Sequence, residues 1–110
     1  MHPKLKVLFL CSQNKKRSPT AEEIYSAFDS LEVRSAGINK GAVYSLESED
    51  IEWADIIFVM EKKHLENLYR KYPIFTKNKR VINLSIPDKY AFMDKTLIKV
   101  LRQKVDKYVL

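Results

Sequence analysis

A thiol and an arginine six residues later lie in the segment 11–18, CSQNKKRS. A loop of this length can wrap backbone N–H groups around a tetrahedral anion, and the planar guanidinium of Arg17 adds charge-assisted hydrogen bonds. A helix that starts directly after the loop points the positive end of its dipole at the same anion. We therefore expect a phosphate-binding loop formed by Ser12, Gln13, Asn14, Lys15, Lys16, Arg17 and Ser18.

The same positive field favours the thiolate form of Cys11 at neutral pH. A thiolate beneath a bound phosphoryl group is a nucleophile in line for attack on phosphorus. A lone cysteine is more often a small buried apolar residue, so it is the surrounding loop that favours a chemical role for this one.

Four short apolar segments predict the strands that must position this loop. Residues 7–10 form a continuous apolar run that ends at Cys11, the pattern of a strand buried on both faces. Residues 31–36, 56–60 and 81–84 predict three more strands. Ser18 and Pro19 are typical of an N-cap and the first residue of a helix. Further helices are expected over 48–54, over a stripe from Leu65 to Tyr72 stopped by Pro73, and after a cap at Asp94.

Strands that alternate with helices predict an α/β fold, in which a four-stranded parallel sheet lies between two helical layers. In such sheets ligands gather at the carboxyl ends of the strands, where the loop after the first strand would lie. The chain has only two glycines and four prolines among 110 residues and shows no linker or repeat, so we expect one domain over 1–110.

Composition narrows the function further. One cysteine forms no intrachain disulfide and cannot supply a cysteine-based metal cage. The apolar runs are too short for a membrane span or a secretory signal, so a cytoplasmic protein that does not bind membranes is expected. A net charge of +6 favours anionic partners, either phosphorylated protein, small phosphate esters or nucleic acid. Oligomeric state is not predicted.

Residues 7–24, VLFLCSQNKKRSPTAEEI, resemble the signature of low-molecular-weight protein tyrosine phosphatases, which carry Cys-x5-Arg-Ser-Pro at the end of the first strand. Three later segments resemble family segments in the same order. They are Ser35-Ala36-Gly37, residues 53–61 (WADIIFVME) and Pro87-Asp88-Lys89-Tyr90. The resemblance therefore covers nearly the whole chain.

The resemblance implies a metal-independent phosphomonoester hydrolase that needs no cofactor. By resemblance Cys11 attacks phosphorus to give a phosphocysteine, Arg17 binds the phosphate oxygens, and Asp88 protonates the leaving group and then activates water. It also implies that Ser18 hydrogen-bonds the thiolate, that Asn14 holds a left-handed bend in the loop, and that Tyr90 walls the entrance.

The chain departs from the family pattern around the loop. Gln13 stands where the family usually has glycine, and Lys15 and Lys16 replace an apolar residue and a second cysteine. Lys89 replaces a proline after the acid, and Ala91 replaces an aromatic residue. Family members are usually longer between Gly37 and Ile82, so we expect a more open site here.

Three other hypotheses stay open. A phosphocysteine-bearing phosphoryl carrier also places a cysteine loop after its first strand, but it has no use for Arg17 or Asp88. An arsenate reductase would need further cysteines. A non-catalytic phosphate- or nucleic-acid-binding module would need neither the thiol nor the acid. His64 is expected on the polar side of its helix, in a structural or surface role.

Overall fold

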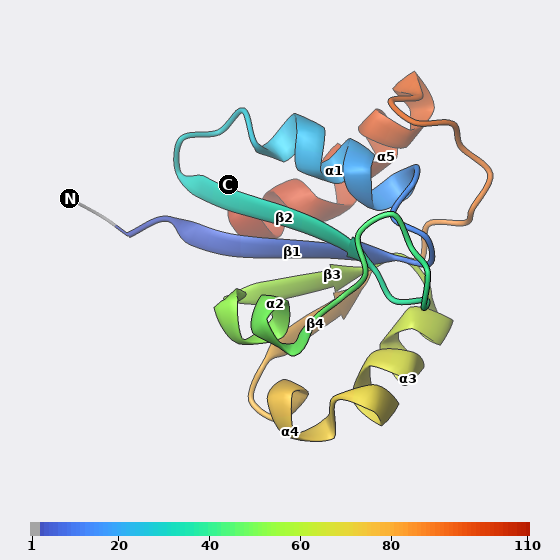
Figure 1. Cartoon of the computed structure of the whole chain (residues 1–110). Helices are drawn as coiled ribbons and strands as arrows, with labels where there is room; N and C mark the ends of the chain where they lie inside the picture. The colour runs from blue at the N-terminus through green and yellow to red at the C-terminus, as the bar shows by residue number, and fades with distance from the viewer. Residues whose placement is uncertain (1–2) are drawn as a thin grey trace.

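A four-stranded parallel sheet forms the centre of the computed structural model, which describes residues 3–110 (Figure 1). The strand order is β2-β1-β3-β4, so the strand that leads into Cys11 is internal. The strands are β1 (Leu5–Cys11), β2 (Leu31–Gly37), β3 (Ile56–Val59) and β4 (Arg80–Asn83).

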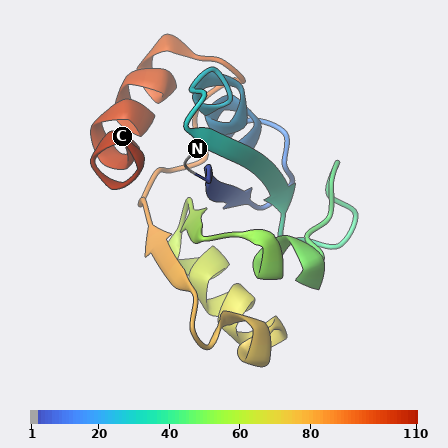
Figure 2. The ribbon, with the colours of Figure 1, turned by 90° about the vertical axis from the view of Figure 1, so that its left-hand side faces the viewer.

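Helices cover both faces of the sheet, and the view roughly along the strands shows the three layers (Figure 2). The helices are α1 (Arg17–Tyr25), α2 (Ser48–Trp53), α3 (Lys62–Lys71), α4 (Pro73–Thr76) and α5 (Lys95–Val109). Helices α1 and α5 pack on one face, and α2, α3 and α4 lie on the other. This arrangement confirms the predicted α/β fold with a loop after the first strand.

Alternation along β1 divides the core between the two faces. Leu8 and Leu10 point to the α2 and α3 side. Phe9 points to the α1 and α5 side, where its ring stacks on Tyr25 at 5.7 Å and on Phe58 at 5.3 Å between centroids. Cys11 ends the strand on the same face as Phe9, and its side chain therefore lies beneath the start of α1.

The expected N-cap at Ser18 is wrong. Helix α1 begins at Arg17, and its N-cap is Lys16, whose side chain makes no capping hydrogen bond. Ser18 lies inside the first turn, and its hydroxyl is 2.9 Å from Cys11 Sγ and 3.0 Å from Asn14 Nδ2. The hydroxyl is therefore used by the loop and not by the helix backbone.

The other helix boundaries follow the sequence more closely. Asp94 caps α5 as predicted, because its carboxylate accepts hydrogen bonds from the backbone N–H groups of Thr96 and Leu97. Pro73 follows the end of α3, but it also starts the one-turn helix α4, which the sequence analysis did not predict. Proline favours a first helical position because it has no N–H to leave unpaired.

The chain after β2 supports the loop after β1. Backbone N–H groups of Ile38, Asn39 and Val43 donate to the carbonyls of Cys11, Ser12 and Gln13 at 2.9, 3.0 and 3.0 Å. The two segments pass so closely that a Cβ on Gly37 would lie 2.8 Å from the Ser12 carbonyl oxygen. Position 37 therefore has room only for glycine, because any Cβ there would overlap its neighbours.

Substitution of Gly37 by alanine should destabilise the protein by about 3 kcal/mol, because the new Cβ would also lie 2.3 Å from the Ala42 Cβ. Gly41→Ala is the matched control, since its Cβ would meet nothing within 4 Å and only the positive φ of 86° adds strain of about 1 kcal/mol. Urea unfolding of both variants measures the difference. An equal loss of unfolding free energy in the two variants would contradict the close packing of the loop after β1 against the chain after β2.

Candidate active site

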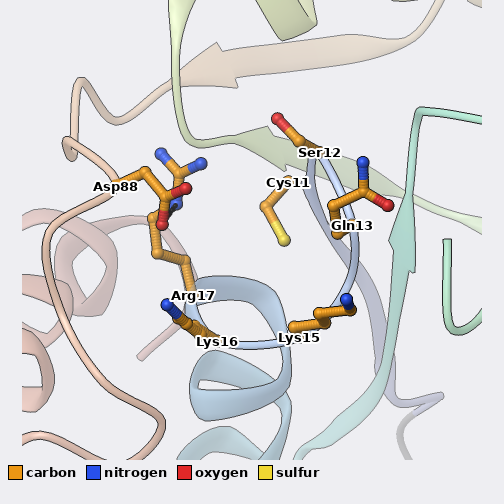
Figure 3. Close-up of a pocket in the computed structure, with 7 residues that line it drawn as sticks. All are labelled: Cys11, Ser12, Gln13, Lys15, Lys16, Arg17 and Asp88. Carbon is orange, nitrogen blue, oxygen red and sulfur yellow. Dashed lines mark ion pairs between the residues drawn. The ribbon is translucent and has the colours of Figure 1, made fainter.

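A pocket of about 200 Å³ opens at the carboxyl end of β1, where parallel sheets place their ligand sites. Figure 3 shows the Cys11 sulfur inside the ring of the loop, with Arg17 and Asp88 on one side. The fold thus brings the expected nucleophile, arginine and acid together. The pocket is lined by Cys11, Ser12, Gln13, Lys15, Lys16, Arg17 and Asp88.

The loop backbone leaves its donors unused. Its carbonyls at residues 11–13 accept hydrogen bonds from the segment after β2. Within residues 3–110, the backbone N–H groups of 12–16 donate no hydrogen bond to another protein group. The first N–H groups of α1 also lack intrahelical partners, as at every helix start. A run of free N–H groups around a pocket can bind an anion.

A chain of hydrogen bonds fixes the surroundings of Cys11. Asn14 has a positive φ of 57°, and its Nδ2 donates to Ser18 Oγ at 3.0 Å and to Ser35 Oγ at 2.9 Å. Ser35 in turn donates to Glu22 Oε1 at 2.6 Å. Because Ser18 Oγ accepts from Asn14, its own hydrogen is free to point at Cys11 Sγ, 2.9 Å away. The left-handed backbone conformation of Asn14 and the contact between Ser18 and Cys11 agree with what the resemblance implies.

Arg17 is the first residue of α1, and its side chain is only 2% exposed. Its Nη1 donates to Glu61 Oε2 at 2.6 Å and to the Ile86 carbonyl at 2.7 Å. Its Nε lies 3.8 Å from Asp88 Oδ1, beyond hydrogen-bond distance. Among the described residues, Nε and Nη2 make no hydrogen bond. This edge of the guanidinium remains available to an anion in the pocket.

Asp88 and Tyr90, which come from one segment after β4, lie in different surroundings. The Asp88 side chain is 58% exposed at the pocket, so it can reach a group bound there. Tyr90 is half-buried, packs against the core between the sheet and α5, and has the Lys89 ammonium 5.4 Å from its ring centroid. Tyr90 is not among the residues that line the pocket.

Two residues that the sequence analysis did not assign to the site, Glu61 and His64, hold it from the start of α3. Each side chain bonds the other residue's backbone in a capping box. The Glu61 carboxylate also binds Arg17, and His64 Nε2 lies 2.7 Å from Ser12 Oγ. The sequence pattern that could have identified these two residues is the Glu-x-x-His spacing directly before an apolar helical stripe.

The buried state of His64 corrects the expectation that it lies on the polar side of its helix. His64 is only 1% exposed to solvent. Its Nδ1 accepts a hydrogen bond from the Glu61 N–H at 3.1 Å, which assigns the ring proton to Nε2 and makes Nε2 the donor to Ser12. Burial, with the nearby Arg17 charge, lowers the pKa of His64 to about 4. The ring is therefore neutral at physiological pH.

Glu61 stays ionised beside Arg17. Burial alone would raise the pKa of Glu61, but the hydrogen bond and charge of Arg17, with Lys63, bring it below its usual value. Glu61 therefore carries a negative charge that pairs with the Arg17 guanidinium.

Two other kinds of site are absent from the part of the chain that the structure describes. No group of three or more His, Cys, Asp or Glu residues is arranged to hold a metal ion. Over the same residues, no helix has the length and apolar character needed to cross a bilayer.

The stability of the protein should fall as pH decreases from 7.5 to 5, in part because of His64. The unfolded chain takes up this proton near pH 6.5, whereas the folded chain resists it down to about pH 4. Stability from this group is therefore full above pH 6.5 and decreases by about 2 kcal/mol at pH 5. His64→Asn keeps an acceptor for the Glu61 N–H and does not titrate.

Urea unfolding of the parent and His64→Asn at both pH values measures the effect. The variant should start less stable at pH 7.5 but lose less on acidification. His2 is present in both proteins and cancels from the comparison. An identical pH dependence in the two proteins would contradict a lowered His64 pKa.

The fold is similar to that of solved phosphatase structures. The tyrosine phosphatase Wzb from Escherichia coli K30, in complex with phosphate, matches with a TM-score of 0.76 and 21% identity over 94% of this chain and 95% of that chain. The YwlE arginine phosphatase from Geobacillus stearothermophilus matches with a TM-score of 0.69 and 21% identity over 94% of each chain.

A low-molecular-weight phosphotyrosine phosphatase from Vibrio cholerae O395 matches with a TM-score of 0.64 and 22% identity, over 87% of this chain and 86% of that chain. No protein-family model and no curated protein matches the sequence. From the sheet order to the loop that follows β1, the chain has the fold of the low-molecular-weight phosphotyrosine phosphatases.

Proposed function

We propose that the protein is a metal-independent phosphatase that works through a phosphocysteine on Cys11. One observation carries the proposal: the Cys11 sulfur lies at the base of a pocket lined by unpaired loop N–H groups and by the free edge of a buried guanidinium. These are the donors that a phosphoryl group needs in its transition state. The solved structures of the same fold include tyrosine and arginine phosphatases, which supports this chemistry.

In the first step the Cys11 thiolate attacks phosphorus, so the S–P bond forms as the P–O bond to the leaving group breaks. Arg17 and the loop N–H groups hold the equatorial oxygens, where negative charge must be stabilised. Asp88 donates its proton to the leaving oxygen, which departs as an alcohol or phenol. Its exposure at the pocket leaves it free to reach that oxygen.

In the second step water attacks the phosphocysteine. Asp88, now a carboxylate, takes a proton from that water as the O–P bond forms. The S–P bond breaks, inorganic phosphate is released and the thiolate is restored. Ser18 donates a hydrogen bond to the sulfur as it leaves.

The position of Asp88 favours a hydrolase over the other hypotheses. A phosphoryl carrier or a simple phosphate-binding module needs no acid at the mouth of the pocket. Binding to nucleic acid by base stacking would need aromatic side chains at the pocket, and none lines it among the described residues. We place the enzyme in the cytoplasm, where a free thiol stays reduced.

Hydrolysis of para-nitrophenyl phosphate and phenyl phosphate between about pH 5 and 7, with a chelator present, tests the proposal. Cys11→Ser should abolish turnover of both esters. Asp88→Asn should lower kcat on phenyl phosphate by about a hundredfold, and by less on the nitrophenyl ester because nitrophenolate leaves without a proton.

Asp29→Asn is the matched control, since Asp29 is exposed and lies in the turn after α1. It should leave both rates unchanged. Turnover that survives in Cys11→Ser, or that stops when the chelator is added, would contradict the proposal. Phosphate binding without turnover would favour the carrier or the binding module.

An open pocket should discriminate weakly between aryl and alkyl esters. The pocket of about 200 Å³ has no aromatic side chain among its lining residues to clamp a phenyl ring. The KM values of phenyl phosphate and a primary alkyl phosphate should therefore lie within about tenfold of each other. A KM for the aryl ester that is lower by a hundredfold or more would contradict this expectation.

A further inference from the structure

Two lysines at the pocket are not explained by binding one phosphoryl group. Lys15 and Lys16 line the pocket between Asn14 and Arg17, and both are exposed. Figure 3 shows both on the part of the loop that joins the helix, with their side chains pointing away from each other. Within residues 3–110 neither lysine forms an ion pair, whereas Arg17 has Glu61.

The balance of charge leaves these lysines in excess. Asp88 is the only carboxylate among the described residues that line the pocket, and its Oδ1 lies 3.8 Å from Arg17 Nε. In the proposed function, Arg17 and the loop N–H groups already bind the phosphoryl group over Cys11. Among the described residues no carboxylate pairs with either ammonium group, so both attract a further anionic group to the rim of the pocket.

We propose that the substrate is a small phosphate monoester that carries a second phosphate group. The first phosphoryl group binds over Cys11, and the second binds Lys15 and Lys16 at the rim. This inference rests on the proposed phosphatase function and names its substrate class. Lysine is a point-charge donor with flexible reach, which suits a second phosphate that needs charge more than fixed geometry.

The arrangement favours a bisphosphate or a diphosphate over a ligand that is recognised by shape. The pocket supplies charge but, among the described lining residues, no ring for stacking. Two exposed ion pairs together give a preference of about tenfold. This preference should decrease with salt, because charges in solvent are screened.

Binding to the Cys11→Ser protein tests the inference without turnover. Titration calorimetry at pH 7 and constant ionic strength would compare inorganic phosphate with inorganic pyrophosphate. Pyrophosphate should bind about tenfold more tightly. Combining Lys15→Gln with Lys16→Gln should remove most of this preference, so that the affinities for pyrophosphate and inorganic phosphate come within about twofold of each other.

Lys99→Gln is the matched control, because Lys99 is exposed on α5 and does not line the pocket. It should keep the tenfold preference. Kinetics on the active protein give a second measurement with a matched pair of esters, propyl phosphate and 1,3-propanediol bisphosphate. The bisphosphate should have the higher kcat/KM, and the double lysine variant should make the two nearly equal.

The outcomes separate this inference from the function on which it rests. If inorganic phosphate binds and para-nitrophenyl phosphate is hydrolysed, but pyrophosphate binds no more tightly, the second phosphate site is overturned and the phosphatase remains. If Lys99→Gln loses the preference as fully as the double variant, the effect is one of net charge and the site is also overturned. If inorganic phosphate does not bind at all, both proposals fail.

Discussion

The buried guanidinium of Arg17 is the constraint on which the rest of the site depends. A charge that is only 2% exposed must be paired, because an unpaired buried charge costs several kcal/mol. Its partners come from the start of α3, through Glu61, and from the chain after β4, through the Ile86 carbonyl. The arginine can therefore keep its place only if segments on both sides of the sheet meet at the carboxyl ends of the strands. The same contacts leave one guanidinium edge toward the pocket.

The loop is held in the same way, by partners from outside it. Its carbonyls bond the segment after β2, its Asn14 bonds Ser35 on β2, and its Ser12 bonds His64 on α3. Each of these contacts uses an acceptor or a side chain, so the backbone N–H groups remain free for a ligand. A single turn of chain, the capping box of Glu61 and His64, therefore fixes both the arginine and the loop.

The scaffold and the rim of the pocket have separate roles. The sheet and its helices have a fold that solved structures of a tyrosine phosphatase and an arginine phosphatase share. In the proposed function the loop after β1 binds the phosphoryl group, whereas side chains around the mouth of the pocket select the substrate. In this chain the mouth carries Lys15 and Lys16. This is the basis for expecting common chemistry and a distinct, more anionic substrate.

The role of Asp88 was assigned from the resemblance to the phosphatase family. The amino-acid pattern alone predicted the four strands, four of the five helices in their order, and the position of the loop with Cys11 and Arg17. Those features are local, because apolar runs set the strands and the parallel sheet places their ends at one edge. It misplaced the start of α1 and the surroundings of His64. Both depend on contacts that form only when the chain folds, since the Ser18 hydroxyl bonds the sulfur of Cys11 and the His64 ring is buried against Ser12, 52 residues away. Contacts between residues that distant leave no periodic pattern, and the burial that lowers the pKa of His64 exists only after folding.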